Sequence, residues 1–124
     1  MATILIIDDH ALTRKVLNRR LAREGFNILE AENGADGVQL LRTKDVDLVL
    51  LDFMMKVMNG IETYEKIKFF KPEVPCVMMT AYAHSALVKQ FMEEGGADFL
   101  VKPIREDFEH RIKDILEKFG SNLN

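Results

Sequence analysis

The sequence lacks the features that are typical of secreted, membrane-spanning and multidomain proteins. It contains a single cysteine, Cys76, which has no partner for an intramolecular disulfide, so a reducing cytoplasm is the expected location. Its apolar runs are far shorter than a membrane span, and its N-terminus carries no positive segment typical of a signal peptide. We find no low-complexity segment, no linker rich in proline or glycine, and no internal repeat. The 124 residues therefore predict one globular domain.

The net charge is small. Seventeen basic residues against 20 acidic ones give −3 at neutral pH, which argues against a chain that coats nucleic acid or an anionic membrane. The sequence has no helix-turn-helix segment and no basic tail, so we expect no direct binding to nucleic acid. With 48% hydrophobic residues, the chain has enough apolar side chains to bury a core.

Short apolar segments recur along the chain at intervals that fit a strand followed by a crossover helix. Two of them, Ile4–Ile7 and Leu48–Leu51, are apolar at consecutive positions, as expected for strands that are buried on both faces of a parallel sheet. The expected strands are Ile4–Ile7, Asn27–Ala31, Asp47–Leu51, Pro75–Met79 and Asp98–Val101.

The intervening segments read as helices. Between about Glu106 and Phe119, the apolar residues follow a single helical stripe, and Gly120 is a natural C-cap. The other expected helices are one that carries Leu17 and Leu21 and ends at Gly25, one over about Ala35–Arg42, one over about Gly60–Phe70, and one that carries Leu87 and Phe91 before Gly95. Five strand–helix units predict an α/β fold, an open, doubly wound parallel sheet with helices on both faces. In such sheets the functional site lies at the carboxyl ends of the strands.

Four of the expected strands lead directly into residues that can carry chemistry, namely Asp8 and Asp9, Asp52, Thr80, and Lys102 with Pro103. Carboxylates brought close together repel one another and are most simply stabilised by a divalent cation. A set of oxygen ligands without cysteine or histidine favours Mg²⁺ or Ca²⁺ over zinc, and Mg²⁺ suits a small open cluster beside a phosphate. A carboxylate nucleophile with a metal, a lysine and a hydroxyl indicates phosphoryl transfer to an aspartate.

These residues lie in motifs that resemble those of the receiver domains of bacterial two-component response regulators, the family of the chemotaxis response regulator. The resemblance covers Ile4 to Phe119. It depends on Ile6-Ile7-Asp8-Asp9, Leu50-Leu51-Asp52-Phe53-Met54-Met55 with Met58-Asn59-Gly60, Met79-Thr80-Ala81, and Gly96-Ala97-Asp98-Phe99-Leu100-Val101-Lys102-Pro103. The resemblance implies a flavodoxin-like fold of five strand–helix units with strand order 2-1-3-4-5.

The resemblance also implies a role for each acid. Asp52 would be the phosphoacceptor and would attack a phosphohistidine on a sensor histidine kinase or a histidine phosphotransfer protein. Asp9 and Asp52, with the backbone carbonyl of Met54, would bind Mg²⁺ directly. Asp8 would act on the metal through a bound water.

Residues after the fourth strand and around the fifth would bind the phosphoryl group and switch with it. By resemblance, Lys102 would pair with Asp52 and then with the phosphoryl group, next to Thr80 and Ala81. Thr80 would move toward a phosphoryl oxygen, and Phe99 would turn inward. A cis peptide would join Lys102 to Pro103, which is plausible only because residue 103 is proline.

Two surfaces are candidates for partner binding. By resemblance, the face of the fourth helix, fifth strand and fifth helix would bind a downstream effector or form a homodimer. Its expected solvent side carries Lys89, Glu93, Arg105, Glu109 and Lys113. The first helix carries Arg14, Lys15, Arg19, Arg20 and Arg23, which form either a solvated face or a docking surface for an acidic kinase or phosphotransfer helix.

The sequence departs from the family pattern at Lys56, where proline is usual, so we expect a more mobile loop with altered partner choice. Tyr82 and Met54 are bulky, and we expect them to hinder the hydrolytic water and to lengthen the life of the acyl phosphate. Aspartyl-phosphate phosphatases typically carry an acid at the position of Met54, so we expect no turnover enzyme. The alternative is a receiver-like interaction domain that is not phosphorylated.

The expected receiver domain spans residues 1–120, and residues 121–124 form a frayed tail, which leaves no room for an output domain. The chain is then either a stand-alone regulator or a piece of a longer protein.

Overall fold

The computed structural model describes residues 2–55 and 58–119. Within them, five strands alternate with five helices along the chain. The strands are β1 (Thr3–Ile7), β2 (Asn27–Ala31), β3 (Leu48–Asp52), β4 (Cys76–Thr80) and β5 (Asp98–Val101). The helices are α1 (Ala11–Arg23), α2 (Gly34–Thr43), α3 (Gly60–Phe70), α4 (Ala86–Glu93) and α5 (Phe108–Phe119). The positions of Lys56, Gly120 and the tail at 121–124 lie outside the described residues.

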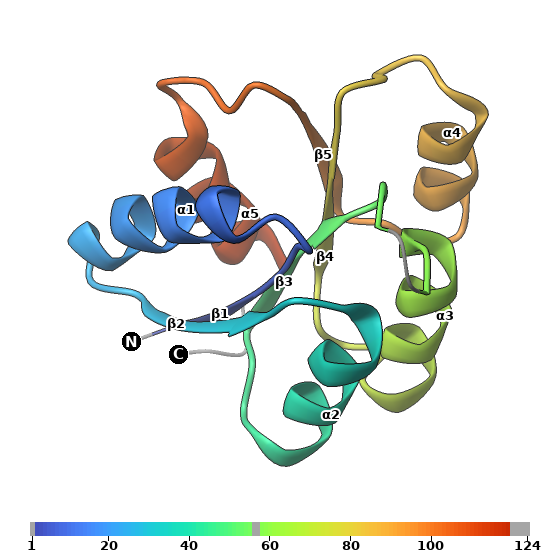
Figure 1. Cartoon of the computed structure of the whole chain (residues 1–124), viewed down its shortest axis with the longest axis horizontal. Helices are drawn as coiled ribbons and strands as arrows, with labels where there is room; N and C mark the ends of the chain where they lie inside the picture. Colours follow the sequence, from blue (N-terminus) through green and yellow to red (C-terminus); the bar gives the residue numbers. More distant parts are fainter. Residues whose placement is uncertain (1, 56–57, 120–124) are drawn as a thin grey trace.

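All five strands are parallel and lie in the order β2-β1-β3-β4-β5, so the predicted doubly wound, flavodoxin-like fold is confirmed. Helices α1 and α5 cover one face of the sheet, and α2, α3 and α4 cover the other (Figure 1). No helix in the described part of the chain is long and apolar enough to cross a membrane.

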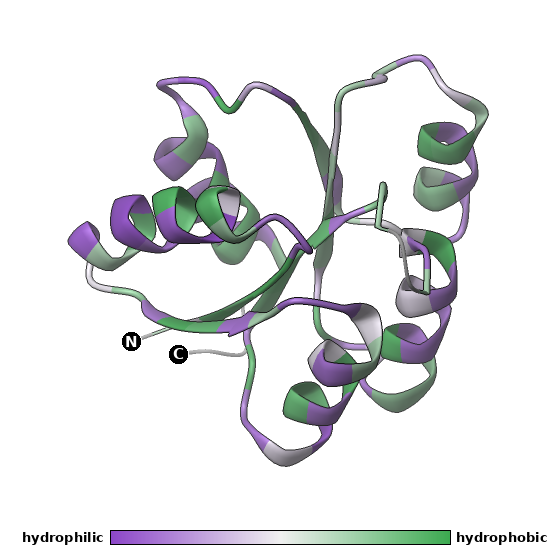
Figure 2. Ribbon diagram, viewed as in Figure 1, coloured by the Kyte–Doolittle hydropathy of each residue, from purple (hydrophilic) through white to green (hydrophobic). Residues whose placement is uncertain are grey.

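The hydrophobic core lies in two layers because successive side chains of a strand point to opposite faces of the sheet. On β1, Leu5 and Ile7 pack toward α2, α3 and α4, whereas Ile4 and Ile6 pack toward α1 and α5. All four are fully buried. Figure 2 shows hydrophobic residues concentrated in the strands and hydrophilic residues toward the outside of the helices. The continuous apolar run at Ile4–Ile7 is thus explained by burial on both faces.

Two predicted strands begin and end one residue too early, and three boundaries of two helices also differ. Strands β3 and β4 end at Asp52 and Thr80, because the backbones of these polar residues still pair with Met79 and Val101 on the neighbouring strands. Helix α5 begins at Phe108, not near Glu106, since a turn precedes it. Helix α2 begins one residue earlier than expected, after its N-cap Asn33, and ends one residue later.

The helix ends follow local sequence signals. The side chain of Asn59 accepts a hydrogen bond from the backbone N–H of Glu62 and caps α3. Gly25 and Gly95 follow α1 and α4 with φ of +94° and +107°, a backbone conformation that side chains disfavour. Gly60 lies so close to Phe53 that a Cβ atom there would come within 2.5 Å of the Phe53 Cα. This contact fixes the start of α3 beside the end of β3.

Candidate functional site: an acidic pocket with one lysine

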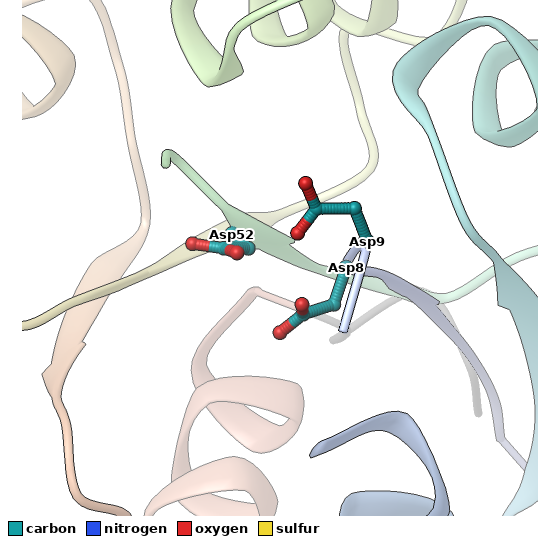
Figure 3. A group of neighbouring side chains, drawn as sticks. All are labelled: Asp8, Asp9 and Asp52. Atoms are coloured by element: carbon teal, nitrogen blue, oxygen red, sulfur yellow. The ribbon is translucent and has the colours of Figure 1, made fainter. Parts of the chain in front are cut away.

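Three carboxyl groups meet at the carboxyl edge of the sheet. Strands β1 and β3 are neighbours with Ile7 opposite Leu51, so the residues that come next, Asp8 and Asp52, lie side by side. Carboxylate oxygens of Asp8, Asp9 and Asp52 all lie within 4.8 Å of one another, and Figure 3 shows the three groups converging from two strand ends. The side chains of Asp8 and Asp52 are buried, and that of Asp9 is exposed. The sequence-based expectation that these three acids come together is therefore met.

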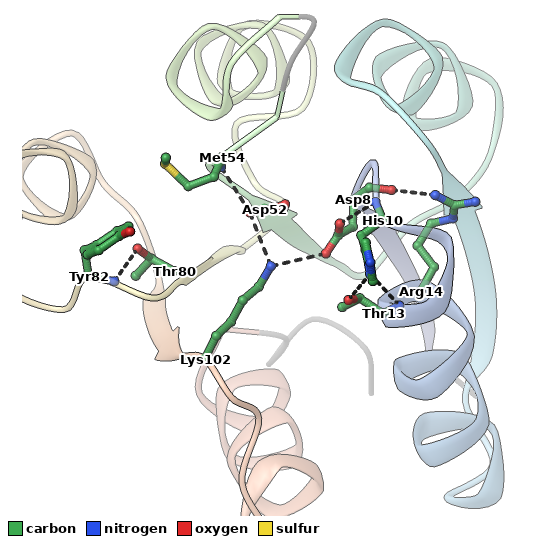
Figure 4. Close-up of polar contacts among 9 residues, drawn as sticks. All are labelled: Asp8, His10, Thr13, Arg14, Asp52, Met54, Thr80, Tyr82 and Lys102. Carbon is green, nitrogen blue, oxygen red and sulfur yellow. Dashed lines mark hydrogen bonds and ion pairs between the residues drawn. The ribbon is translucent and has the colours of Figure 1, made fainter.

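Lys102 brings a positive charge to this acidic cluster. Its Nζ lies 3.5 Å from Asp8 Oδ2 and 3.5 Å from Asp52 Oδ1 (Figure 4). The Lys102 backbone N–H donates to the Thr80 carbonyl at 2.7 Å, which fixes the end of β5 against the end of β4. The peptide bond from Lys102 to Pro103 is cis, as the sequence analysis expects. One lysine thus bridges two buried carboxylates that would otherwise only repel each other.

The Asp8 carboxyl is buried in surroundings that disfavour its charged form. Burial raises the pKa of the Asp8 carboxyl above its ordinary value, and the nearby Asp52 carboxyl raises it further. The backbone N–H of His10, which donates to Asp8 Oδ1 at 2.8 Å, and the Lys102 ammonium act in the opposite direction. Among the described residues, Asp8 Oδ2 is the one buried side-chain oxygen or nitrogen without a hydrogen bond.

These features fit a hard divalent cation. The donors are carboxylate oxygens, two of the three carboxylates are buried, and one buried oxygen has no hydrogen bond. Mg²⁺ prefers such ligands and keeps several waters, which the exposure of Asp9 to solvent permits. The chemistry of the residues present is thus compatible with a magnesium site.

The loop after β3 is tied to Asp52. The backbone N–H of Met54 donates to Asp52 Oδ1 at 3.0 Å, while the Met54 side chain is exposed. Phe53 is buried and packs edge-to-face on Phe91 of α4, with ring centroids 5.1 Å apart. The two residues after Asp52 thus contact its carboxylate through Met54 N–H and helix α4 through the Phe53 ring.

The expected switch residues lie where the sequence places them. Thr80 is buried at the end of β4, and its hydroxyl accepts from the backbone N–H of Tyr82 at 3.0 Å. Ala81 and Tyr82 are exposed at the rim. Phe99 lies on β5 opposite Met78 and packs, partly buried, on the core layer under α2, α3 and α4.

Two expectations about charged surfaces are wrong because α5 packs against α1. Arg20 of α1 donates two hydrogen bonds of 2.7 Å to the carboxylate of Glu109 on α5. Lys113 of α5 likewise pairs with Glu24. Glu109 and Lys113 therefore face α1 and not the readout face, and Arg20 is held in a contact between helices and not free for docking.

The contacts of two arginines were not predicted from the sequence. Arg14 donates to the Asp8 carbonyl at 2.7 Å and pairs with Glu30 of β2 at 3.1 Å, so it anchors the backbone that carries the acid pair. Arg111 of α5 donates to Asp98 and to the Phe99 carbonyl, and so lies over β5. The signal for Arg14 was its position one turn after the acid pair, at the start of a helix.

The fold and the acidic pocket together define a receiver-type α/β domain. Comparison with known proteins agrees, since the family model for the response regulator receiver domain matches residues 4–114. The chain is 34% identical over 122 residues to the chemotaxis protein CheY of Bacillus subtilis, which covers 98% of this chain and 97% of CheY. The protein therefore belongs to the response regulator receiver domain family of two-component systems.

Other relatives are longer proteins. The chain is 40% identical over 102 residues to a cyclic di-GMP phosphodiesterase of Thermotoga maritima, covering 82% of this chain and 27% of that protein. It spans about a quarter of the length of this and of several transcriptional regulatory proteins that it also matches.

Solved structures show the same fold. A CheY-like receiver domain from Methanospirillum hungatei superposes with a TM-score of 0.92 at 24% identity over 98% of both chains. The response regulator TrrA of Thermotoga maritima, in complex with Mg²⁺ and BeF, superposes with a TM-score of 0.83 at 28% identity. That structure covers 94% of this chain and 100% of TrrA.

Proposed function

We propose that this receiver domain accepts a phosphoryl group on Asp52 from a phosphohistidine of a sensor histidine kinase or histidine phosphotransfer protein. The observation that carries the proposal is the position of Lys102, whose Nζ is 3.5 Å from both Asp8 and Asp52 in an otherwise acidic pocket. A carboxylate on a rigid central strand, beside a cation and a cluster of metal-type ligands, is equipped for nucleophilic attack on phosphorus.

In the proposed reaction, an Asp52 carboxylate oxygen forms a bond to phosphorus as the bond between phosphorus and the histidine nitrogen breaks. The leaving imidazole keeps the electron pair of that bond and takes up a proton. Asp52 stays oriented because Met54 N–H donates to its Oδ1. Lys102, with its side chain 28% exposed, can follow the negative charge from the carboxylate to the phosphoryl oxygens.

Mg²⁺ would be held by Asp9, Asp52 and the backbone carbonyl of Met54, with Asp8 reaching it through water. When bound, it would supply positive charge that offsets the repulsion between the acids and the incoming phosphoryl group. The structure of TrrA in complex with Mg²⁺ and BeF supports this assignment.

The signal would leave the pocket through Thr80 and Phe99. Thr80 would exchange its present contact with Tyr82 N–H for a hydrogen bond to the phosphoryl group, and Phe99 would turn further into the core. The readout face of α4, β5 and α5 then presents Lys89, Glu93, Arg105 and Arg111 to an effector or a second copy. We infer that this domain acts by switching partners and not by turnover.

The test is incubation with acetyl phosphate and Mg²⁺, followed by mass spectrometry of the intact protein and of its peptides. We expect one phosphoryl group on Asp52, and none in the Asp52→Asn variant. The matched control is Asp45→Asn, at an exposed acid outside the pocket, which should be labelled like the wild type. Mg²⁺ binding without any modification of Asp52 would favour the alternative, a receiver-like interaction domain that is not phosphorylated.

We further propose that Tyr82 and Met54 shield the acyl phosphate from water. Both side chains are exposed at the mouth of the pocket, on the loops that follow Thr80 and Asp52. Replacing Tyr82 with asparagine should speed loss of the phosphoryl group by up to roughly tenfold, or about 1.4 kcal/mol of barrier height. Dephosphorylation would be followed after removal of acetyl phosphate, with His110→Asn as a distant control. An unchanged rate in Tyr82→Asn would contradict the shielding role.

A further inference from the structure

The carboxy-terminal end of α3 exposes two neighbouring aromatic rings. Phe69 is 80% exposed and Phe70 is 40% exposed, and their ring centroids lie 5.2 Å apart in an edge-to-face contact. Ile67, which lies across the helix from Phe69, is buried in the core. Folding therefore requires the side of α3 that carries Ile67, but it does not require a phenylalanine at position 69, because most of that ring remains in water.

Two basic side chains accompany these rings, and exposed Glu65 lies one helical turn before Phe69. The Arg42 guanidinium of α2 lies over the Phe70 ring at 4.7 Å from its centroid. Lys66 is one helical turn before both phenylalanines and is exposed on the same side of α3. Neither cation has a carboxylate within ion-pair distance among the described residues. We call Phe69, Phe70, Arg42 and Lys66 the aromatic–basic surface.

This surface is remote from the acidic pocket. Helix α3 starts at Gly60, against Phe53 next to Asp52, and runs 11 residues to Phe70. At the ordinary helical rise this separates the two ends by about 16 Å. In Figure 1, α2 and α3 lie next to each other on the same face of the sheet. A partner on the aromatic–basic surface would leave the pocket open to a kinase.

We propose that the aromatic–basic surface docks an acidic segment of a partner protein that also carries an apolar side chain. The apolar side chain would lie against the Phe69 ring and remove it from water, and the acidic residues would pair with Arg42 and Lys66. Aromatic anchors next to arginine are typical of the residues that dominate the free energy of protein interfaces.

Charge and shape favour this occupant over two others. In a symmetric dimer through this surface, Arg42 and Lys66 would face their own copies, and like charges would oppose each other. On an anionic membrane, Phe69 alone would insert, because Arg42 covers one face of the Phe70 ring.

The test is selection of a displayed library of random peptides on the intact protein. We expect the enriched peptides to combine aspartate or glutamate with a leucine, phenylalanine or tryptophan. Synthetic copies should bind about tenfold more weakly or worse to Phe69→Ser and to Arg42→Glu than to wild type. Binding should also weaken with added salt and should not change after treatment with Mg²⁺ and beryllofluoride.

The matched control is Leu12→Ser, which removes another highly exposed apolar side chain, 65% exposed, from α1. It should bind the selected peptides like the wild type. Phe69→Ser should still accept a phosphoryl group on Asp52 from acetyl phosphate, so failure at this surface is distinguishable from failure of the proposed function. Circular dichroism would establish that each variant is folded.

Several results would overturn the proposal. One is a selection that enriches no peptides, or peptides without acidic residues. Another is equal peptide binding by the wild type and Phe69→Ser. Pelleting with phosphatidylglycerol vesicles that is lost in Phe69→Ser would assign the surface to a membrane. Self-association that is lost in the same variant would assign it to a second copy of this chain.

Discussion

Without metal, the Asp8→Asn variant should be more stable than the wild type. With Mg²⁺, the variant should be less stable than the wild type. Without metal, the Asp8 carboxyl is buried beside Asp52, and its Oδ2 has no hydrogen bond. Asparagine has nearly the same shape but no charge, so it removes the repulsion. When Mg²⁺ is present, the negative charge of Asp8 attracts the ion, so loss of that charge weakens Mg²⁺ binding.

The size of the expected change in unfolding free energy follows from the contacts of Asp8. A buried polar atom without a hydrogen bond costs about 1–3 kcal/mol, and Lys102, only partly buried, recovers a fraction of this cost. We expect Asp8→Asn to gain about 1–2 kcal/mol of unfolding free energy in a chelator, or about 3–8 °C in Tm. Saturating Mg²⁺ at a hundred times its Kd would stabilise the wild type by about 2.7 kcal/mol and the variant by much less.

The assay is thermal unfolding of both proteins in EDTA and in Mg²⁺, with Asp45→Asn as the control. The order of the two Tm values should reverse between the two conditions. A variant that is less stable than the wild type in EDTA would refute the reasoning, because it would show that the Asp8 charge is already satisfied without metal.

Because Asp8 is buried, the stability of the metal-free protein should also depend on pH. Burial raises the native pKa of Asp8 above its ordinary value of 3.8, so the folded metal-free chain holds a proton that the unfolded chain releases. Its contribution to stability therefore falls as pH rises from about 3.8 to the raised native value, and the penalty is complete above that value. Asp8→Asn should lack this fall in metal-free buffer.

The remaining predictions concern packing and an ion pair. Arg20→Ala should lower the free energy of unfolding in urea by about 1 kcal/mol at neutral pH, because it removes two hydrogen bonds to Glu109. Arg20 lowers the pKa of Glu109, so this contribution should be lost as pH falls through the lowered native value, and equal urea midpoints at neutral pH would contradict it. Gly60→Ala should cost about 1–3 kcal/mol, since its Cβ would meet the Phe53 backbone at 2.5 Å, and an unchanged denaturation midpoint would count against that contact.

The fold was predictable because the sequence signals agree at several levels. Consecutive apolar residues at Ile4–Ile7 mark a strand buried on both faces, and the periodic apolar stripe before Phe119 marks the last helix. Strand boundaries were less accurate where a functional residue ends a strand. Asp52 belongs to β3 by its backbone pairing with Met79, although its side chain is polar and reads as a loop residue.

The acidic cluster was predictable because parallel strands end at one edge, which brings Asp8 and Asp52 together once β1 and β3 are neighbours. Ion pairs between helices were not predictable, because they depend on how each helix is rotated about its axis. Arg20 and Glu109 are 89 positions apart, and nothing local in either helix shows that they meet. The contact of Arg14 with the Asp8 carbonyl is local, six positions apart, and could have been predicted from its place one turn after the acid pair.

The position of Asp52 in the sheet determines how often the backbone around it unfolds locally. It ends β3, the middle strand, whose residues are all buried and which pairs with β1 on one side and β4 on the other. Backbone amides there exchange with solvent only when most of the domain unfolds. Helix α4 has only eight residues and two buried side chains, so we expect it to open more often. We thus expect the Asp52 carboxylate to be carried by a slowly opening strand, next to a helix that opens more readily.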